Sequence, residues 1–293
     1  MNELYQSALA ELQEKLVILP DKPEETPENT LKALWRLAQG ASCSVETATA
    51  TPMTPLIGDQ EQVFSAFVGK RLKGTPLAYL TGRQVFMGIE MLVSPGALIP
   101  RKETQILANA ITEIVSSNSS PSVIIDLCTG VGNLAIYCAK TFPGASVFAS
   151  DLSVDAIESA KVNAGFCGVE RIDFRDGNMF ACFESEEFYH KVDLISCNPP
   201  YISQGRLKTM PDEIVGHEPT AAFDGGPLGI SIISKLTSDA HRFLKPGGWV
   251  AFEIGLGQGR GLLRRIGSMP EYCNVRSFCD HAGEVRAVAM QKN

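Results

Sequence analysis

Apolar residues in the first quarter of the chain recur three or four positions apart, the spacing of helices with one buried face. The stretch from Asp21 to Pro27, which contains Pro23, breaks this pattern. Helices are predicted at 2–19, from 27 to about 40, within 41–56 and at 59–72. Residues 1–74 are therefore predicted to form a small N-terminal helical domain, most of whose residues serve packing.

Two short apolar runs follow, at 85–86 and 89–93, and they flank the dipeptide Met87-Gly88. Two such runs across a two-residue turn predict a β-hairpin. We assign residues 75–100 to a β-hairpin linker between the helical domain and the rest of the chain.

The remaining residues, 101–293, alternate apolar runs with helical segments. Strands are predicted at 123–126, 146–150, 171–174, 192–197 and 249–254, with a closing antiparallel pair at 275–278 and 285–290. Helices are predicted from 101 to about 115, from about 133, at 155–163 and at 230–244, with a Ser-rich loop at 116–122 and a tight turn at 245–248. This alternation predicts an α/β fold built on a mainly parallel, doubly wound sheet.

Composition narrows the class of protein. The 293 residues are 44% hydrophobic and 20% charged, which is typical of a soluble globular protein. A net charge of -7, from 33 acidic and 26 basic residues, argues against a broad nucleic-acid surface. The eight cysteines form no Cys-x-x-Cys pair and the four histidines are scattered, so neither a zinc site nor a redox pair is indicated. Because several cysteines lie in apolar runs, and no run resembles a secretory signal or could cross a bilayer, we expect a cytoplasmic protein without a membrane partner.

The most informative stretch is Asn198-Pro199-Pro200-Tyr201, directly after the apolar run 192–197. Two prolines cannot continue a strand, so they form a rigid turn beyond its carboxyl end, where ligands bind in open α/β sheets. Asn198 and Pro199 offer oxygen acceptors, and Tyr201 offers an aromatic face. These groups suit a planar NH2 group, which predicts amino or amide chemistry. The alternative is that the prolines only end the strand and Asn198 caps the next helix.

A second candidate site lies at the ends of the first two strands of the sheet. The loop Asp126-Leu127-Cys128-Thr129-Gly130-Val131-Gly132 has glycines where a backbone must approach a ligand, and Asp151 ends the next strand, where a carboxylate can accept both ribose hydroxyls. Dinucleotide-binding loops take a pyrophosphate, which Asp126 would repel. S-adenosylmethionine, a cation that carries a ribose, fits better. Asp126 would serve its amino-acid end and Asp151 its ribose.

The adenine of this cofactor is expected beside Asn178 and Met179, which follow the third strand. Asn178 would hydrogen-bond to the ring and Met179 would pack against it. The alternative is that Asn178 is only a turn residue.

With both candidate sites considered, the chain resembles the peptide chain release factor glutamine N5-methyltransferases, the PrmC/HemK family. The resemblance covers nearly the whole chain and is specific as a set, although Asn-Pro-Pro-Tyr alone is shared with amino-methylases of nucleic-acid bases. The motifs that carry it are residues 75–82 (Thr-Pro-Leu-Ala-Tyr-Leu-Thr-Gly), 99–104 (Ile-Pro-Arg-Lys-Glu-Thr), 126–132, 198–201, 217–219 (His-Glu-Pro), 252–255 (Phe-Glu-Ile-Gly) with Gln258, and Asp280, Gly283 and Arg286.

The resemblance implies a class I methyltransferase domain with a seven-stranded Rossmann-like sheet, S-adenosylmethionine as cofactor, and a glutamine of a release factor as acceptor. The acceptor would lie at Asn198, Pro199, Pro200 and Tyr201. The cofactor-binding residues expected on this basis are Asp126, Cys128, Thr129, Gly130, Gly132, Asp151, Leu152, Asn178, Met179, Arg101, Glu103 and Thr104. Two stretches near the cofactor depart from the family pattern: 102–105 reads Lys-Glu-Thr-Gln in place of Pro-Glu-Thr-Glu, and Cys128 stands in place of a glycine.

Other functions remain open at this point. The same acceptor clamp could hold the α-amine of S-adenosylmethionine itself, as in the related azetidine-2-carboxylate synthases, where that amine attacks the γ-carbon and methylthioadenosine leaves. A small-molecule substrate is therefore an alternative to a release factor. Methylation of DNA or RNA bases would require a basic patch or target-recognition region that the sequence lacks. An inactive binding module is disfavoured by the intact Asn198 and Asp151.

Overall fold

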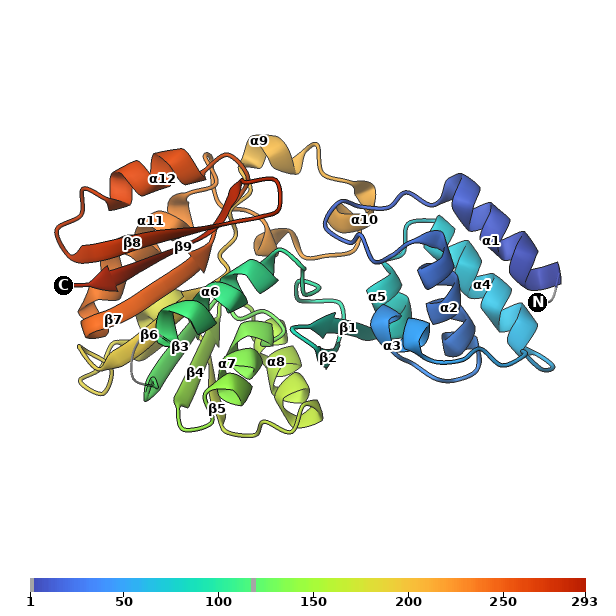
Figure 1. The fold of residues 1–293 in the computed structure, drawn as a ribbon, viewed down its shortest axis with the longest axis horizontal. Helices are drawn as coiled ribbons and strands as arrows, with labels where there is room; N and C mark the ends of the chain where they lie inside the picture. The colour runs from blue at the N-terminus through green and yellow to red at the C-terminus, as the bar shows by residue number, and fades with distance from the viewer. Residues whose placement is uncertain (1–2, 117–119) are drawn as a thin grey trace.

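The computed structural model describes residues 3–116 and 120–293. Within them the chain forms a group of N-terminal helices, a two-stranded hairpin and a seven-stranded sheet covered by helices on both faces. Figure 1 places the N-terminal helices to the right of the sheet, with the hairpin between them. Part of the Ser-rich loop predicted at 116–122 lies outside the described residues.

The N-terminal helices are α1 (Glu3–Lys15), α2 (Pro27–Ala38), α3 (Val45–Ala50), α4 (Gln60–Leu72) and α5 (Leu77–Thr81). Their apolar faces meet in one core around Leu12, Leu34 and Phe64, all of which are fully buried. Side-chain oxygens start two of the helices, because Thr26 caps α2 and Ser44 caps α3.

The helix predicted at 2–19 ends at Lys15, so the prediction of a helical turn at 16–19 was wrong. Pro20 follows, and a residue before proline is disfavoured in the helical region. Leu19 instead leaves the helical group and packs against Ile214 and Phe223, far along the chain. A tertiary contact therefore decides where this helix stops.

The predicted hairpin is confirmed as β1 (Arg83–Phe86) and β2 (Ile89–Leu92). Met87 and Gly88 both have positive φ, 50° and 75°, which is the combination that a tight two-residue hairpin turn needs. Asn163 holds the hairpin against the sheet domain by bonding the backbone N–H and C=O of Leu92 at 2.7 and 3.0 Å.

The sheet has the order β5-β4-β3-β6-β7-β9-β8, in which β3 to β7 are parallel and β9 runs antiparallel to both of its neighbours. Its strands are β3 (Val123–Leu127), β4 (Ser146–Asp151), β5 (Ile172–Asp176), β6 (Val192–Cys197), β7 (Leu244–Glu253), β8 (Tyr272–Cys279) and β9 (Val285–Lys292). The predicted doubly wound α/β fold is confirmed.

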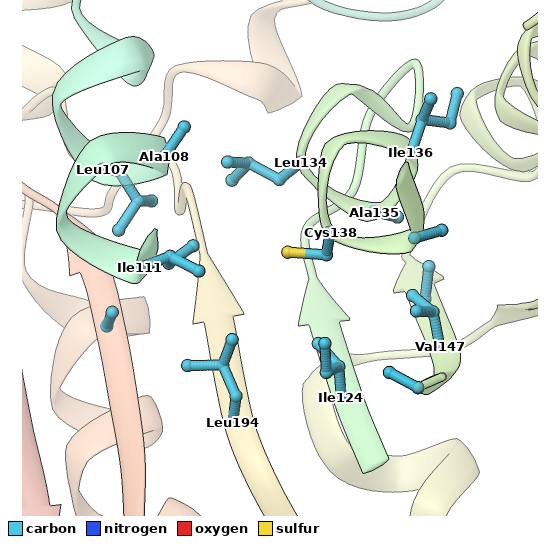
Figure 2. Close-up of a cluster of buried hydrophobic side chains, with 14 of the residues drawn as sticks. Leu107, Ala108, Ile111, Ile124, Leu134, Ala135, Ile136, Cys138, Val147 and Leu194 are labelled. Atoms are coloured by element: carbon cyan, nitrogen blue, oxygen red, sulfur yellow. The ribbon is translucent and has the colours of Figure 1, made fainter. Parts of the chain in front are cut away.

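Helices cover both faces of this sheet (Figure 1). One face carries α6 (Thr104–Ser116), α7 (Asn133–Thr141) and α8 (Val154–Phe166), and the other carries the 3-10 helix η1 (Met179–Phe183), α11 (Ser231–Asp239), η3 (Ala240–Arg242) and α12 (Gly259–Ile266). Figure 2 shows Leu107 of α6 and Leu134 and Cys138 of α7 in one cluster above Ile124 and Leu194 of the sheet. The next residue along each strand faces the second group, so a strand buried on both sides reads as one continuous apolar run.

Strand β7 begins earlier than predicted. We expected a tight turn at 245–248, but Leu244 already pairs with Val192, and the ladder resumes with Leu194 opposite Trp249. The intervening residues form an irregularity within the strand. Gly248 fits there because a Cβ would lie 2.9 Å from the Val192 carbonyl oxygen. The helix predicted at 230–244 accordingly ends at Asp239, and η3 follows it.

The segment between β6 and β7 links the N-terminal helices to the sheet. Its first part, before α11, contains three short helices: α9 (Gln204–Leu207), α10 (Asp212–Val215) and η2 (Thr220–Ala222). Glu213 of α10 forms ion pairs with Lys22 and Arg71, and Glu218 pairs with Arg101. In the described part of the chain, no helix combines the length and apolar character needed to cross a membrane.

Candidate active site

The predicted acceptor residues lie where β6 ends, between the ends of β3 and β7. Asn198 Nδ2 donates a 3.0 Å hydrogen bond to Oγ1 of Thr104, the first residue of α6. Among the described residues, no donor bonds to Asn198 Oδ1 or to the Pro199 carbonyl. Both oxygens are therefore free of protein donors within the described residues.

Tyr201 is held at both its ends. Its hydroxyl donates a 2.8 Å hydrogen bond to Glu253 Oε1 at the end of β7, and its carbonyl accepts a 3.0 Å bond from Gln258 Nε2. The ring packs so closely on Gly255 that a Cβ there would lie 3.0 Å from the ring carbon Cδ2. Burial raises the pKa of the Tyr201 hydroxyl well above its usual value, and the nearby Glu253 carboxylate acts in the same direction.

Gln258 also ties this turn to the next loop. Its Nε2 donates to the Gly229 carbonyl at 3.0 Å, and its Oε1 accepts from the Gly255 N–H at 2.8 Å. Pro199 is buried and Pro200 is half-buried, with the Pro200 carbonyl against Gly225. The Asn-Pro-Pro-Tyr turn is thus fixed on both sides before any ligand arrives.

The predicted cofactor loop after β3 has an unusual backbone. Cys128, Gly130 and Gly132 have positive φ values of 56°, 54° and 84°. Gly132 packs against α8, since an added Cβ would lie 3.1 Å from Ala160 Cβ, whereas a Cβ at Gly130 would meet open space. Cys128 adopts the left-handed region without being a glycine, so this position carries backbone strain.

The two aspartates predicted to hold the cofactor have different surroundings. Asp126 is fully buried, and its carboxylate accepts 2.7 Å bonds from the hydroxyls of Ser196 and Thr129. Burial raises its pKa to about 6. Asp151 is only half-buried and accepts 2.9 Å bonds from the N–H groups of Gly130 and Ser153. In this structure Asp126 is engaged by the protein itself, and Asp151 is the carboxylate closer to solvent.

The loop after β5 meets the loop after β3. Met179 is buried with a φ of 57°, and its Sδ lies 3.7 Å from Cys128 Sγ. Asn178 beside it is exposed, and its side chain makes no capping hydrogen bond to η1. Leu152, next to Asp151, is 71% exposed. The structure therefore brings Met179 to Cys128 and leaves Asn178 and Leu152 at the surface.

The residues predicted at 101–104 lie on the acceptor side. Arg101 is buried in ion pairs with Glu218 and Asp21, and Thr104 contacts Asn198. Glu103 is half-buried, and burial raises its pKa. No hydrogen bond joins these residues to the loop after β3 within the described ranges.

Several residues around this site had no role predicted from the sequence: Ser196, Glu218, Glu253, Gln258 and Arg286. All but Ser196 lie in the motifs that carry the family resemblance. Membership of those motifs was the sequence signal that could have identified them. The cavities of about 790 and 540 Å³ lie elsewhere, one between α6 and β8 and the other at 139–143 and 168–171.

The strand order, the ligand side of the sheet and the acceptor turn define a class I methyltransferase. A family model for the methyltransferase small domain matches residues 102–245. Among solved structures, the hMettl16 catalytic domain in complex with a 3′UTR hairpin has 15% identity and a TM-score of 0.51, over 68% of this chain and 75% of that one. A methyltransferase from Pyrococcus furiosus has 17% identity and a TM-score of 0.50, over 78% and 99%. These likenesses concern the fold.

Sequence relatives identify the family. The release factor glutamine methyltransferase of Koribacter versatilis is 33% identical over 79% of this chain and 81% of its own length. That of Moorella thermoacetica is 36% identical over 75% and 76%. The chain belongs to the release factor glutamine methyltransferase family. It is an N-methyltransferase that depends on S-adenosylmethionine. These relatives give the cyclase alternative no support.

Proposed function

We propose that this protein transfers a methyl group from S-adenosylmethionine to the side-chain amide nitrogen of a glutamine in a peptide chain release factor. The observation that carries the proposal is the orientation of Asn198. Its Nδ2 is taken by Thr104, so its Oδ1 is left for an incoming NH2 group. The matching relatives, named for the same reaction, support a release factor as the partner.

The residues at the ends of β3, β4 and β5 suit this cofactor. The half-buried Asp151 carboxylate can accept ribose hydroxyls, and the open space over Gly130 lets a ligand approach the backbone. Buried acids repel phosphate and suit a cation. We therefore assign Asp151, Leu152, Asn178 and Met179 to the nucleoside, and the loop 126–132 to the amino-acid end. The side chain of Asp126 would act there by holding Thr129.

S-adenosylmethionine supplies an electrophilic methyl group on a sulfonium. The protein must present the amide nitrogen, whose lone pair is delocalised into the carbonyl. Asn198 Oδ1 and the Pro199 carbonyl would each accept a hydrogen bond from the amide NH2 group. These two bonds would favour the positive charge that develops on the nitrogen. Tyr201 would pack on the flat amide group. Such positioning can supply about 7–11 kcal/mol in favourable cases, so no strong general base is required.

A methylation assay with purified protein tests this function. We expect S-adenosylhomocysteine and one added methyl group per release factor, located on a glutamine by fragment mass spectrometry. A release factor with that glutamine replaced by asparagine serves as the control and should stay unmodified. Nucleoside product formed without any protein acceptor, or methylthioadenosine in place of S-adenosylhomocysteine, would contradict the proposal.

The Asn198→Ala variant tests the acceptor side of the clamp. Because Asn198 contacts the acceptor and not the nucleoside, we expect turnover to fall by about a hundredfold or more while the Kd for S-adenosylmethionine changes little. Isothermal titration and single-turnover rates measure the two quantities. An equal loss of both would move Asn198 out of the acceptor site.

We also propose a three-part organisation, with a helical domain at 1–74, a hairpin linker at 75–100 and a catalytic domain at 101–293. The separate cores of the helices and the sheet support it. We further propose that the protein works in the cytoplasm. Its cysteines are free, and three of them are buried in apolar surroundings, as expected in a reducing compartment.

A further inference from the structure

One buried carboxylate, in the segment that follows the acceptor turn, bonds the residues that lead into α6. Glu218 lies between α10 and η2, and its side chain is fully buried. Its Oε2 accepts the Ile99 N–H at 3.0 Å, and its Oε1 accepts from Nη2 of Arg101. Both partners directly precede Thr104, the first residue of α6, whose Oγ1 accepts Asn198 Nδ2 at 3.0 Å. Glu218 therefore holds the residues just upstream of the partner of Asn198.

The segment that contains Glu218 is also bonded to the exit of the acceptor turn. Ile202, the residue after Tyr201, donates its N–H to the Phe223 carbonyl and accepts from the Gly225 N–H, both at 2.9 Å. The side chains of Ile202 and Phe223 share one apolar cluster. Phe223 follows Glu218 across the single short helix η2. The chain that leaves the turn therefore folds back beside it before it reaches the rest of the sheet.

Together these contacts form a closed ring around the acceptor turn. In order, the ring consists of residues 198–202, Phe223, Glu218, residues 99–104 and again Asn198. Each step is either the covalent chain or one of the hydrogen bonds above. A substitution of Glu218 opens the ring without changing any residue that contacts the proposed acceptor.

Burial makes the bonds of Glu218 difficult to replace. The side chain of Arg101 is 9% exposed and also pairs with Asp21, at 3.2 Å, in the stretch between α1 and α2. Removing one charge of such a buried pair leaves the other uncompensated. A glutamine at position 218 keeps one accepting oxygen, but its NH2 group only donates. It therefore cannot serve both Ile99 and Arg101 in the present geometry.

We propose that Glu218 is a positioning residue of the acceptor site, which holds the start of α6 against the Asn-Pro-Pro-Tyr turn. This inference rests on the proposed methyl transfer to an amide. With the ring closed, Thr104 takes Asn198 Nδ2, and the Asn198 oxygen is left for the acceptor NH2 group. With the ring open at Glu218, residues 99–104 can shift relative to the turn, and Asn198 loses its fixed orientation. The loop after β3 lies outside the ring, so cofactor binding should not depend on Glu218.

The test compares Glu218→Gln with Glu213→Gln, a matched control from the same segment. Glu213 also pairs with buried cations, but its partners Lys22 and Arg71 lie outside the ring. We expect both variants to lose stability toward denaturant and only Glu218→Gln to lose kcat, by about tenfold to a hundredfold. The Kd for S-adenosylmethionine should stay within about twofold in both. An equal loss of kcat in the two variants, or a loss of cofactor affinity together with kcat, would overturn the inference.

Two more variants keep the test decisive if Glu218→Gln does not fold. Glu218→Asp retains the charge that pairs with Arg101 but is one methylene shorter, so it cannot reach Ile99 as well. We expect it to fold and to lose kcat by about threefold to tenfold. Thr104→Val opens the ring at its other side-chain bond, so adding it to Glu218→Asp should make kcat no worse than in the poorer single variant. Wild-type kcat in folded Glu218→Asp, or losses that add in the double variant, would contradict the proposal.

A second measurement separates this inference from the proposed function. The side-chain amide protons of Asn198, assigned in a ¹⁵N spectrum of the cofactor complex by their absence in Asn198→Asp, report its orientation without an acceptor. We expect E218Q, E218D and T104V to shift or broaden them and E213Q to leave them unchanged. If the wild type does not methylate a release factor but these shifts occur, only the proposed function fails. If the wild type is active and the Glu218 variants neither shift the amide nor slow turnover, only the role of Glu218 fails.

Discussion

Arg71 is the centre of a buried charge cluster that joins the N-terminal helices to α10. Its guanidinium bonds Glu25 at 2.8 Å and Glu213 at 2.7 Å, and Lys22 bonds Glu213 at 2.9 Å. The cluster balances two positive and two negative charges, and the side chain of Arg71 is 2% exposed. Replacing Arg71 by Met, which has no charge, leaves one negative charge buried and unpaired. Breaking a buried pair in this way costs about 3–5 kcal/mol at neutral pH.

Glu25 makes this cost depend on pH. Its pKa is raised to about 7 from 4.5 by burial, although Arg71 and Lys22 oppose the shift. Glu213 has a lowered pKa despite its burial, because it pairs with both cations. Glu25 therefore takes the proton first. Protonated Glu25 stabilises the fold fully below pH 4.5, which is the pKa of this group in the unfolded chain. This stabilisation is lost as the pH rises through about 7, and the loss amounts to about 3 kcal/mol of the free energy of unfolding.

In Arg71→Met the main charge that stabilises ionised Glu25 in its buried position is gone, so the pKa of Glu25 rises further. We expect the destabilisation to be largest near about pH 8 and to shrink by about 1 kcal/mol near about pH 5, where Glu25 is protonated in the folded variant. Glu25→Gln in the same background removes the unpaired charge and leaves the Lys22–Glu213 pair, so it should restore most of the lost stability.

The two tryptophans give a direct assay, because Trp35 lies in α2 and Trp249 lies in β7. Urea unfolding of single-tryptophan versions, with the other residue replaced by Phe, reports the helices and the sheet separately. We expect Arg71→Met to lower the midpoint of the Trp35 transition more than that of Trp249. A loss below about 1 kcal/mol at about pH 8, or no recovery with Glu25→Gln, would refute the reasoning about the buried cluster.

Two further variants probe the cofactor side. Gly132→Ala should lower the free energy of unfolding, measured with denaturant, by about 2–4 kcal/mol, since its φ is +84° and the new Cβ meets Ala160 at 3.1 Å. Adding Ala160→Gly should relieve only the steric part of this cost. The control Gly168→Ala, with a φ of +68° and open space around it, should cost clearly less. The pKa of Asp126 is raised from 3.8 to about 6, so its contribution to stability is complete below 3.8 and lost as the pH rises through about 6. Asp126→Asn should therefore gain about 2 kcal/mol relative to wild type between about pH 4 and pH 7, and a difference that does not vary with pH would exclude a buried charge there.

The sheet was predictable because its strands are buried on both faces and helices follow them at regular intervals. Ile124 and Ile125 pack on opposite faces and both are fully buried, so no polar residue separates them. The hairpin was predictable from Met87-Gly88 for a similarly local reason, a turn that needs two positive φ values.

Element ends that depend on distant contacts were not predictable. Leu19 leaves α1 to pack on Ile214, and no residue near it in the sequence announces that partner. Leu244 joins β7 because Val192 offers a ladder position across the sheet. Helical or turn propensity at these positions is worth less than the buried contact that each residue gains.

Contacts between residues far apart in the sequence also limit what could be predicted of the proposed acceptor site. Asn198 could be proposed from the sequence because its signal is local: an amide at the end of a strand, followed by prolines. Apart from the motifs of the family resemblance, Thr104 and Glu253 have no local signature, since a threonine at a helix start and a glutamate at a strand end are ordinary residues. Their role comes from the parallel sheet, which brings the ends of β6 and β7 together under the start of α6.

The contacts of Asp126 were also not predictable from the sequence. The sequence does not show whether a carboxylate before a glycine-rich turn faces a ligand or a pair of hydroxyls of the protein. Here Ser196, on the neighbouring strand β6, takes one carboxylate oxygen and Thr129 takes the other. Because Ser196 is two residues before Asn198, Asp126 bonds the strand that presents the acceptor clamp as well as the cofactor loop. We infer that this carboxylate sets the distance between donor and acceptor loops, and that its charge matters less than its two hydrogen bonds, which is why Asp126→Asn is expected to fold well.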